Sequence, residues 1–273
     1  MNRTCKNYLF VFSTLAMITF MMISNPSLLV ADQTDATQAF LTAIKKGNSE
    51  EVSLLIEEKN IDLEYRDELG RTPLILATTL KNNAISIILI DAGASLDAQD
   101  NNGLTPLMHA IESGDIKLAR LLIDSGSSLE LHKKTGETAL IESSRQGQFK
   151  TVQLLLDKGA QIDAVDHDGW TAFVYAATSN FIEMAELLLA RGAQIDAKDK
   201  YNYTPLMYSV ETGKKNMVEF LVKNGANLQV KYEDGSNLVK KAVNRGHLST
   251  ARFLAQKGVA VDKESVNILD GNQ

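Results

Sequence analysis

The chain has 273 residues, of which 44% are hydrophobic and 23% are charged, and only 4 are prolines. This composition excludes a collagen-like, low-complexity or wholly disordered chain. The net charge of -6 disfavours a nucleic-acid partner, and the single cysteine, Cys5, excludes an internal disulfide or a cysteine-rich zinc site.

The first 31 residues have the pattern of a secretory signal peptide. Arg3 and Lys6 precede an apolar run at 8–23, and the polar stretch 24–27 follows it. The apolar run has about 16 residues, fewer than the ~20 that a membrane-spanning helix needs. We expect cleavage after Ala31, a periplasmic or secreted protein, and no stable membrane insertion of the mature chain. Retention of the segment as an N-terminal membrane anchor is the alternative.

The rest of the sequence repeats with a period of 33 residues. Two series of glycines keep this spacing, and Asn202 fills the one vacant place in the first series, since Asn tolerates positive φ better than other non-glycine residues. The first series is Gly70, Gly103, Gly136, Gly169 and Gly235; the second is Gly93, Gly126, Gly159, Gly192, Gly225 and Gly258.

Each place in the first series but the last is followed by a threonine that predicts the start of a helix. A Thr oxygen accepts a backbone N–H of the first turn, and a proline at the next position loses no hydrogen bond there. The segments are Thr72-Pro73-Leu74, Thr105-Pro106-Leu107, Thr138-Ala139-Leu140, Thr171-Ala172-Phe173 and Thr204-Pro205-Leu206. A second, more apolar helix is predicted before each glycine of the second series, which ends that helix.

These segments resemble the ankyrin repeat family, whose 33-residue unit is a turn plus two antiparallel helices. The resemblance implies an all-α repeat solenoid, an ankyrin-like stack of about seven helix-turn-helix units with projecting β-hairpin turns. The expected organisation is a signal peptide at 1–31, a repeat domain at 32–264 and a disordered tail at 265–273. The expected units are 33–66, 67–99, 100–132, 133–165, 166–198, 199–231 and 232–264.

The sequence departs from the family pattern at two places. The histidine that follows Thr-Pro-Leu in the family is missing, which removes a polar network between repeats and leaves apolar contacts to replace it. Its places are taken by Ile75, Met108, Ile141, Val174, Met207 and Lys240. The last unit carries several basic and polar residues, which we expect to form a solvated outer face. These are Lys240, Lys241, Asn244 and Arg245.

In ankyrin-like proteins a partner binds at the hairpin tips and the concave face of the first helices. Trp170, the only tryptophan, and Tyr203 occupy equivalent tip positions, and exposed aromatic residues are favoured as interface anchors. Tyr175 and Tyr208 begin the following helices and are expected to fill the core between repeats. The candidate partner-binding residues are five at the tips, His167, Trp170, Tyr201, Tyr203 and Leu104, and one on the concave helix face, Arg145.

The sequence contains no phosphate loop, nucleophile elbow or metal-binding helix motif. We therefore expect no catalysis and no cofactor. The pattern favours an exported, monomeric, non-enzymatic module that binds a partner protein of unknown identity. A membrane-tethered scaffold is the alternative, and an enzyme or enzyme subunit is the remaining one.

Overall fold

The computed structural model describes residues 26–58 and 61–271, and these residues form fifteen helices and no strand. Residues 1–25 of the signal segment expected at 1–31 lie outside the described residues. The chain divides into two compact units with the boundary between Ala98 and Gln99. Within the described ranges, no helix is both long and apolar enough to cross a membrane.

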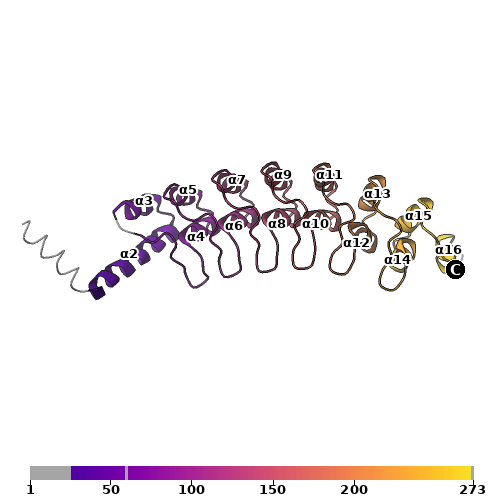
Figure 1. Cartoon of the computed structure of the whole chain (residues 1–273), viewed down its shortest axis with the longest axis horizontal. Coiled ribbons are helices and arrows are strands. Elements are labelled where there is room, and N and C mark those ends of the chain that lie inside the picture. The colour runs from indigo at the N-terminus through magenta and orange to yellow at the C-terminus, as the bar shows by residue number, and fades with distance from the viewer. Residues whose placement is uncertain (1–25, 59–60, 272–273) are drawn as a thin grey trace, which may run out of the picture. The chain divides into compact units, whose positions relative to one another are not determined.

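The described residues of unit 1, 26–58 and 61–98, form four helices, which are labelled in Figure 1. They are α2 (Pro26–Lys46), α3 (Ser49–Glu58), α4 (Pro73–Thr79) and α5 (Asn83–Asp91). Helix α2 contacts α3 and α4, and α3 contacts α5. Phe40 and Ile44 are one turn apart on α2 and both are fully buried, so this face of α2 belongs to the core of unit 1.

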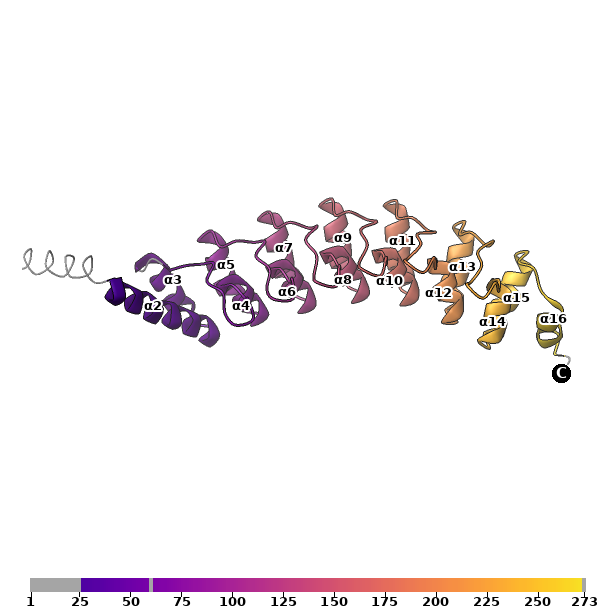
Figure 2. The same cartoon turned by 60° about the horizontal axis from the view of Figure 1, so that its bottom comes forward.

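Unit 2 is a stack of five helix pairs followed by a single helix. The first helices of the pairs form one row and the second helices form another, and the loops between pairs project from the first row (Figures 1 and 2). The pairs are α6 (Pro106–Glu112) with α7 (Ile116–Asp124), α8 (Ala139–Arg145) with α9 (Phe149–Asp157), α10 (Ala172–Thr178) with α11 (Ile182–Ala190), α12 (Pro205–Glu211) with α13 (Lys215–Lys223), and α14 (Leu238–Asn244) with α15 (Leu248–Gln256). The last helix is α16 (Lys263–Leu269).

The predicted threonine caps are confirmed. Thr105 Oγ1 accepts the N–H of Met108 at 3.2 Å, and Thr171 and Thr204 make the equivalent bond at 3.3 Å. Each cap satisfies one backbone donor that the first helical turn leaves without a partner. The residues in the family's histidine place are buried in unit 2, since Met108, Ile141, Val174 and Met207 are at most 1% exposed.

The loops differ from the expected β-hairpins. Only one isolated bridge, between His132 and Thr138, is present in the described part of the chain. Each loop is closed instead by a backbone bond across five residues, as from Asp166 N to Trp170 O and from Asp199 N to Tyr203 O, both 3.1 Å. The residue after Trp170 or Tyr203 is already the N-cap of the next helix, so no residues remain to extend the turn into strands.

The C-terminal segment also differs from the expected disordered tail. Asp262 caps α16 by accepting the N–H of Ser265 at 2.9 Å, and Ser265 is 2% exposed because α16 packs against α14 and α15. Helix α14 is therefore not the end of unit 2, and its basic residues do not form a purely solvated face. Lys240 lies 3.6 Å from Asp262, and Arg245 lies 3.3 Å from Glu211.

Candidate functional site

A polar pair recurs within the repeats of unit 2, between a residue that opens a loop and a residue nine positions later on the first helix. The pairs are Asp100 with His109 at 3.0 Å, Lys133 with Glu142 at 2.6 Å, Asp166 with Tyr175 at 2.7 Å, and Asp199 with Tyr208. In the last repeat the ammonium group of Lys241 lies 4.3 Å from the ring centroid of Tyr232. Each pair ties a loop to the helix that follows it, so polar contacts persist although the family's histidine is missing. The 33-residue spacing of these positions was a sequence signal that could have revealed them.

Asp199 connects two neighbouring loops. Its Oδ1 accepts the backbone N–H groups of Tyr201 and Tyr203, each at 2.9 Å. Its Oδ2 accepts the indole N–H of Trp170 at 3.2 Å and the hydroxyl of Tyr208. Asp199 as a whole residue is only 6% exposed. One buried carboxylate therefore fixes the backbone that carries Tyr201 and Tyr203 and also holds the tryptophan of the preceding loop.

Five aromatic rings form a continuous row, which we call the aromatic cluster: Trp170, Tyr175, Tyr203, Tyr208 and Tyr232. Trp170 lies 5.0 Å from Tyr175 and 4.8 Å from Tyr208, measured between ring centroids. Tyr203 lies 5.2 Å from Tyr208 and 5.4 Å from Tyr232. Tilted and edge-on ring pairs at such distances each stabilise a fold by about 0.5–1.5 kcal/mol beyond the area that they bury. The row crosses three repeats and joins them.

The tyrosines of the cluster are proton donors at neutral pH. Burial raises the pKa of the Tyr175 hydroxyl, and its bond to Asp166 raises that pKa further. Burial and the Asp199 carboxylate raise the pKa of Tyr208 in the same way. Burial also raises the pKa of Tyr232, whose hydroxyl donates to the carbonyl of Met207 at 2.9 Å. These groups hold the row together and are not candidates for general bases.

The structure brings four of the six predicted site residues together on two neighbouring loops. Tyr201 is 54% exposed and His167 is exposed, as expected for tip residues. Trp170 and Tyr203 are half-buried, because both pack within the aromatic cluster. Tyr175 and Tyr208 were expected in the core but are also half-buried, and they link loops to helices.

The other two predicted residues lie elsewhere. Leu104 is 7% exposed, which corrects its placement as a projecting tip residue. The next residue, Thr105, is the N-cap of α6, so the chain at Leu104 has already turned inward. Arg145 lies at the end of α8, with its side chain 46% exposed, and its guanidinium contacts Glu142 at 2.7 Å.

Arg145 belongs to a charged group centred on the fully buried Glu142, which we call the Glu142 cluster. Lys133, Arg145 and Gln146 all donate to this carboxylate, and Lys133 also lies 3.3 Å from Glu112. Burial by itself would raise the pKa of the Glu142 carboxyl, but these hydrogen bonds outweigh it and hold the pKa below its ordinary value. A carboxylate thus stays ionised in the interior of the stack.

Successive loop tips are joined by backbone bonds. The N–H groups of Lys134, His167 and Lys200 donate to the carbonyls of Asn102, Thr135 and Asp168 at 3.0, 3.2 and 3.1 Å. Glycine is required for this approach at Gly136, where φ is +94° and an added Cβ would lie 2.5 Å from the backbone nitrogen of His167. Within the described residues this series ends at Lys200, and Glu233 makes no such bond to Tyr201.

A cavity of about 230 Å³ lies where the series of tip contacts ends. It is lined by Tyr201, Tyr203, Tyr208 and Glu233. Three of the four lining residues are tyrosines and the fourth is a glutamate. The cavity therefore adjoins the aromatic cluster and includes two of the predicted site residues, Tyr201 and Tyr203.

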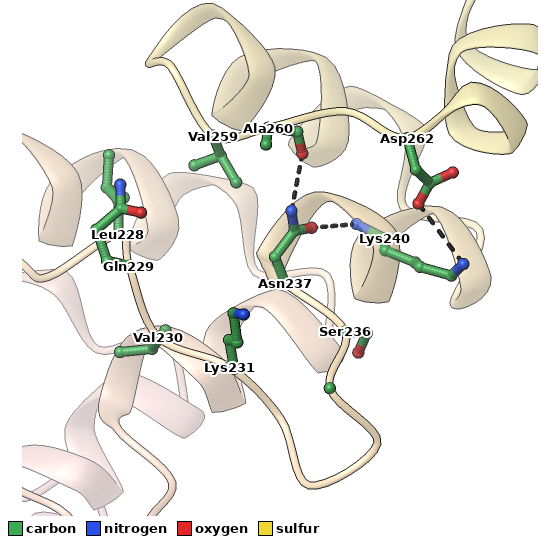
Figure 3. Close-up of a pocket in the computed structure, with 11 residues that line it drawn as sticks. Leu228, Gln229, Val230, Lys231, Ser236, Asn237, Lys240, Val259, Ala260 and Asp262 are labelled. Carbon is green, nitrogen blue, oxygen red and sulfur yellow. Dashed lines mark hydrogen bonds and ion pairs between the residues drawn. The ribbon is translucent and has the colours of Figure 1, made fainter.

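A second hollow of about 310 Å³ lies near α16 (Figure 3). Earlier in unit 2, an acidic side chain accepts a backbone N–H of the next repeat, as Asp163 does from Gln194 at 3.1 Å and Asp196 does from Asn227 at 3.1 Å. Gln229 takes the next place in that series, and it lines the hollow. Asn237 closes the other side by donating to Ala260 O at 2.8 Å. The hollow thus marks a change in how the last repeat is joined to the stack.

Comparison with known proteins identifies similar chains. The family described as "Ankyrin repeats (3 copies)" matches residues 13–100, 82–166 and 162–232. The ankyrin repeat domain of Bcl-3, described as a unique member of the IkappaB protein family, is 30% identical, with a TM-score of 0.68 over 76% of this chain and 96% of that one. An ankyrin repeat domain from Acinetobacter baumannii AYE is also 30% identical, with a TM-score of 0.64 over 69% of this chain and 98% of that one. No curated protein sequence matches.

Proposed function

Because the chain belongs to the ankyrin repeat family, whose repeats generally mediate protein–protein interaction, we propose that it is an exported, non-enzymatic module that binds a partner protein. The binding surface that we propose consists of the loop tips of unit 2 and the adjoining ends of its first helices. Its centre is formed by His167, Trp170, Tyr201 and Tyr203.

The observation that carries this proposal is an exposed aromatic ring on a rigidly held loop. Tyr201 is 54% exposed, while its backbone N–H is held by the buried Asp199 at 2.9 Å. The neighbouring ring of Tyr203 is half-buried and packs on Tyr208. Tyrosine offers both apolar area and a hydrogen-bonding group, and a loop that is already ordered loses little conformational entropy when a partner binds. This surface is therefore suited to anchor a protein.

The export that we propose rests on the sequence pattern of residues 1–31. In this proposal the segment is removed after Ala31, and the mature chain is a monomer that carries the repeat domain at 32–264 in the periplasm or outside the cell. Helix α2 begins at Pro26 and includes Ala31, so in this proposal cleavage removes its first turns. The alternative is that the segment stays as a membrane anchor and the repeats form a tethered scaffold.

The binding site is tested with a variant in which His167→Ala and Tyr201→Ala are combined. Both side chains are exposed, so their removal leaves the aromatic cluster intact. Partners are captured by crosslinking from the periplasmic and extracellular fractions, and the affinity of each purified partner is then measured. We expect the variant to bind at least about tenfold more weakly, since loss of a central anchor typically costs about 2 kcal/mol or more and 1.4 kcal/mol is already tenfold.

Tyr65→Ala is the matched control, because Tyr65 is a 40% exposed tyrosine that lies in unit 1. Equal affinity of the double variant and the wild type would show that the binding site is elsewhere. Circular dichroism of each variant establishes that the fold is retained.

Export is tested by the intact mass of the chain recovered from each cell fraction. A mass that begins at Asp32 in the periplasmic or extracellular fraction supports the proposal. A chain that retains residues 1–31 and sediments with membranes would instead support the tethered scaffold.

A further inference from the structure

We propose that the cavity between the last two loop tips of the aromatic row receives a basic side chain, lysine or arginine, from the partner protein. This inference rests on the proposed function and adds the chemistry of the partner. The cavity is the one lined by Tyr201, Tyr203, Tyr208 and Glu233, which we call the tyrosine cavity.

The tyrosine cavity arises from a local change in the sequence. Gly136 and Gly169 allow the next tip to approach so closely that an added Cβ would lie 2.5 and 2.9 Å from its backbone. Asn202 stands in the equivalent place with φ of +60°, so the backbone path is the same but a side chain is present. Among the backbone bonds of the described residues, none joins this tip to the following one, and the cavity of about 230 Å³ opens there instead.

The walls of the tyrosine cavity have the chemistry that attracts a cation. The face of an aromatic ring carries partial negative charge, and ammonium and guanidinium groups bind over such faces. Two lysines of this chain already do so on the same row of loops. Lys200 lies 5.1 Å from the ring centroid of Tyr201, and Lys241 lies 4.3 Å from that of Tyr232.

The charge at the tyrosine cavity is also unbalanced. The acids around it are neutralised, because Asp168 pairs with Lys200, Asp234 pairs with Lys241 at 3.0 Å, and Glu211 pairs with Arg245 at 3.3 Å. Glu233, which lines the cavity and is exposed, takes part in no ion pair within the described part of the chain. A basic side chain that enters the cavity would meet both the tyrosine rings and this carboxylate. An apolar side chain would use the rings but leave the carboxylate without a counter-ion.

The proposal is tested by titrating the full chain, as isolated, with three small probes. Two are cationic, Nα-acetyl-lysine methylamide and Nα-acetyl-arginine methylamide, and the third, Nα-acetyl-norleucine methylamide, has a similar chain without the charge. Binding is followed by the fluorescence of Trp170, the only tryptophan, which lies 4.8 Å from Tyr208. We expect saturable binding of the cationic probes, at least about fivefold tighter than that of the neutral probe, and weakening as salt is added.

Glu233→Gln is the decisive variant, because it removes the charge and keeps the shape of the side chain. We expect it to weaken binding of both cationic probes about fivefold and to leave the neutral probe unaffected. Glu68→Gln is the matched control, since Glu68 occupies the same place in the first loop, in unit 1, and should change nothing. Tyr201→Ala is a second variant, which removes one exposed wall and should also weaken binding of the cationic probes.

Equal binding of the charged and neutral probes, or no effect of Glu233→Gln, would overturn the inference. Its failure can be distinguished from failure of the proposed function. If the cationic probes do not bind but the His167→Ala, Tyr201→Ala variant still loses its partner, the inference is wrong and the binding site stands. If neither the probes nor the partner respond to these changes, both are wrong.

Discussion

The Glu142 cluster and the aromatic cluster occupy equivalent places in neighbouring repeats. The first is held together by charged side chains and the second by aromatic rings. In each, a residue that opens a loop contacts a residue nine positions later on the first helix: Lys133 with Glu142 in one, Asp166 with Tyr175 in the other. The first pair is ionic and buried, with Glu142 fully inaccessible. The second begins the row of rings that ends at Tyr232, and two rings of that row, Tyr203 and Tyr208, line the tyrosine cavity together with the exposed Tyr201. The backbone thus fixes where a side-chain contact forms, and the side chains decide whether that contact is an ion pair or part of a row of aromatic rings.

The two clusters should also respond to opposite extremes of pH. The pKa of Glu142 is lowered, so the stability that this group contributes is lost as the pH falls. The pKa values of Tyr175 and Tyr208 are raised, so their contribution is present below the ordinary tyrosine pKa of about 10 and is lost as the pH rises through their higher folded values.

The largest effect on stability is expected when Lys133 is removed from the Glu142 cluster. Lys133→Ala leaves a buried carboxylate that only Arg145 and Gln146 still contact, and we expect the free energy of unfolding in urea to fall by about 3 kcal/mol. Lys134→Ala is the control, because Lys134 is exposed and its change should stay within about 0.5 kcal/mol. Equal effects of the two variants would mean that Lys133 does not neutralise Glu142.

A smaller effect is expected when the aromatic cluster loses its carboxylate. Asp199→Ala removes the acceptor of four donors, and we expect the free energy of unfolding to fall by about 2 kcal/mol. The emission of Trp170 should change as well, because its indole N–H loses its partner. Asp168→Ala, which removes an exposed neighbouring carboxylate, should have little effect on either measurement. If Asp168→Ala lowered the free energy of unfolding more than Asp199→Ala does, Asp199 would not be the carboxylate that holds the two loops together.

The free energy of unfolding should depend on the Glu142 cluster, and not on the aromatic cluster, when the pH is lowered. A carboxyl with a lowered pKa in the folded state binds fewer protons there than in the unfolded chain. Its stabilisation is therefore complete above the ordinary pKa of about 4.3 and is lost as the pH falls through the folded value. We expect the loss of stability between pH 6 and pH 3 to be on the order of 1 kcal/mol smaller in Glu142→Gln than in wild type. Glu183→Gln, an exposed change, should keep the wild-type loss, and an unchanged loss in Glu142→Gln would exclude this carboxyl as its source.

The smallest effect on stability is expected at Tyr201, the exposed tyrosine that lines the tyrosine cavity. Tyr201→Ala removes a ring that is 54% exposed, and we expect the free energy of unfolding to change by no more than about 0.5 kcal/mol. The same substitution should weaken partner binding, so at this position we expect the affinity to fall while the stability stays nearly unchanged. A large loss of stability would show that the Tyr201 ring is part of the packing and would weaken its assignment to recognition.

Much of the fold could be read from local sequence signals. The threonine caps and the glycine spacing act within one or two turns of chain, so their consequences do not depend on distant residues. Thr171 caps α10 and Thr204 caps α12 as predicted. The C-terminal helix was missed because it depends on packing: Ser265 is buried only where α16 meets α14 and α15.

The sequence by itself determined that this is a chain of paired helices with projecting loops, and it placed aromatic residues on two neighbouring tips. Only the tertiary structure decided what those residues contact. A carboxylate at 199 and an indole at 170 are far apart in sequence, and the stacking of one repeat on the next brings them to 3.2 Å. In the same way, the burial of Leu104 and the opening of the tyrosine cavity beside Asn202 depend on how closely neighbouring parts of the chain approach. A spacing in one repeat fixes which way the chain turns, but burial and contact between repeats are set by the stack as a whole.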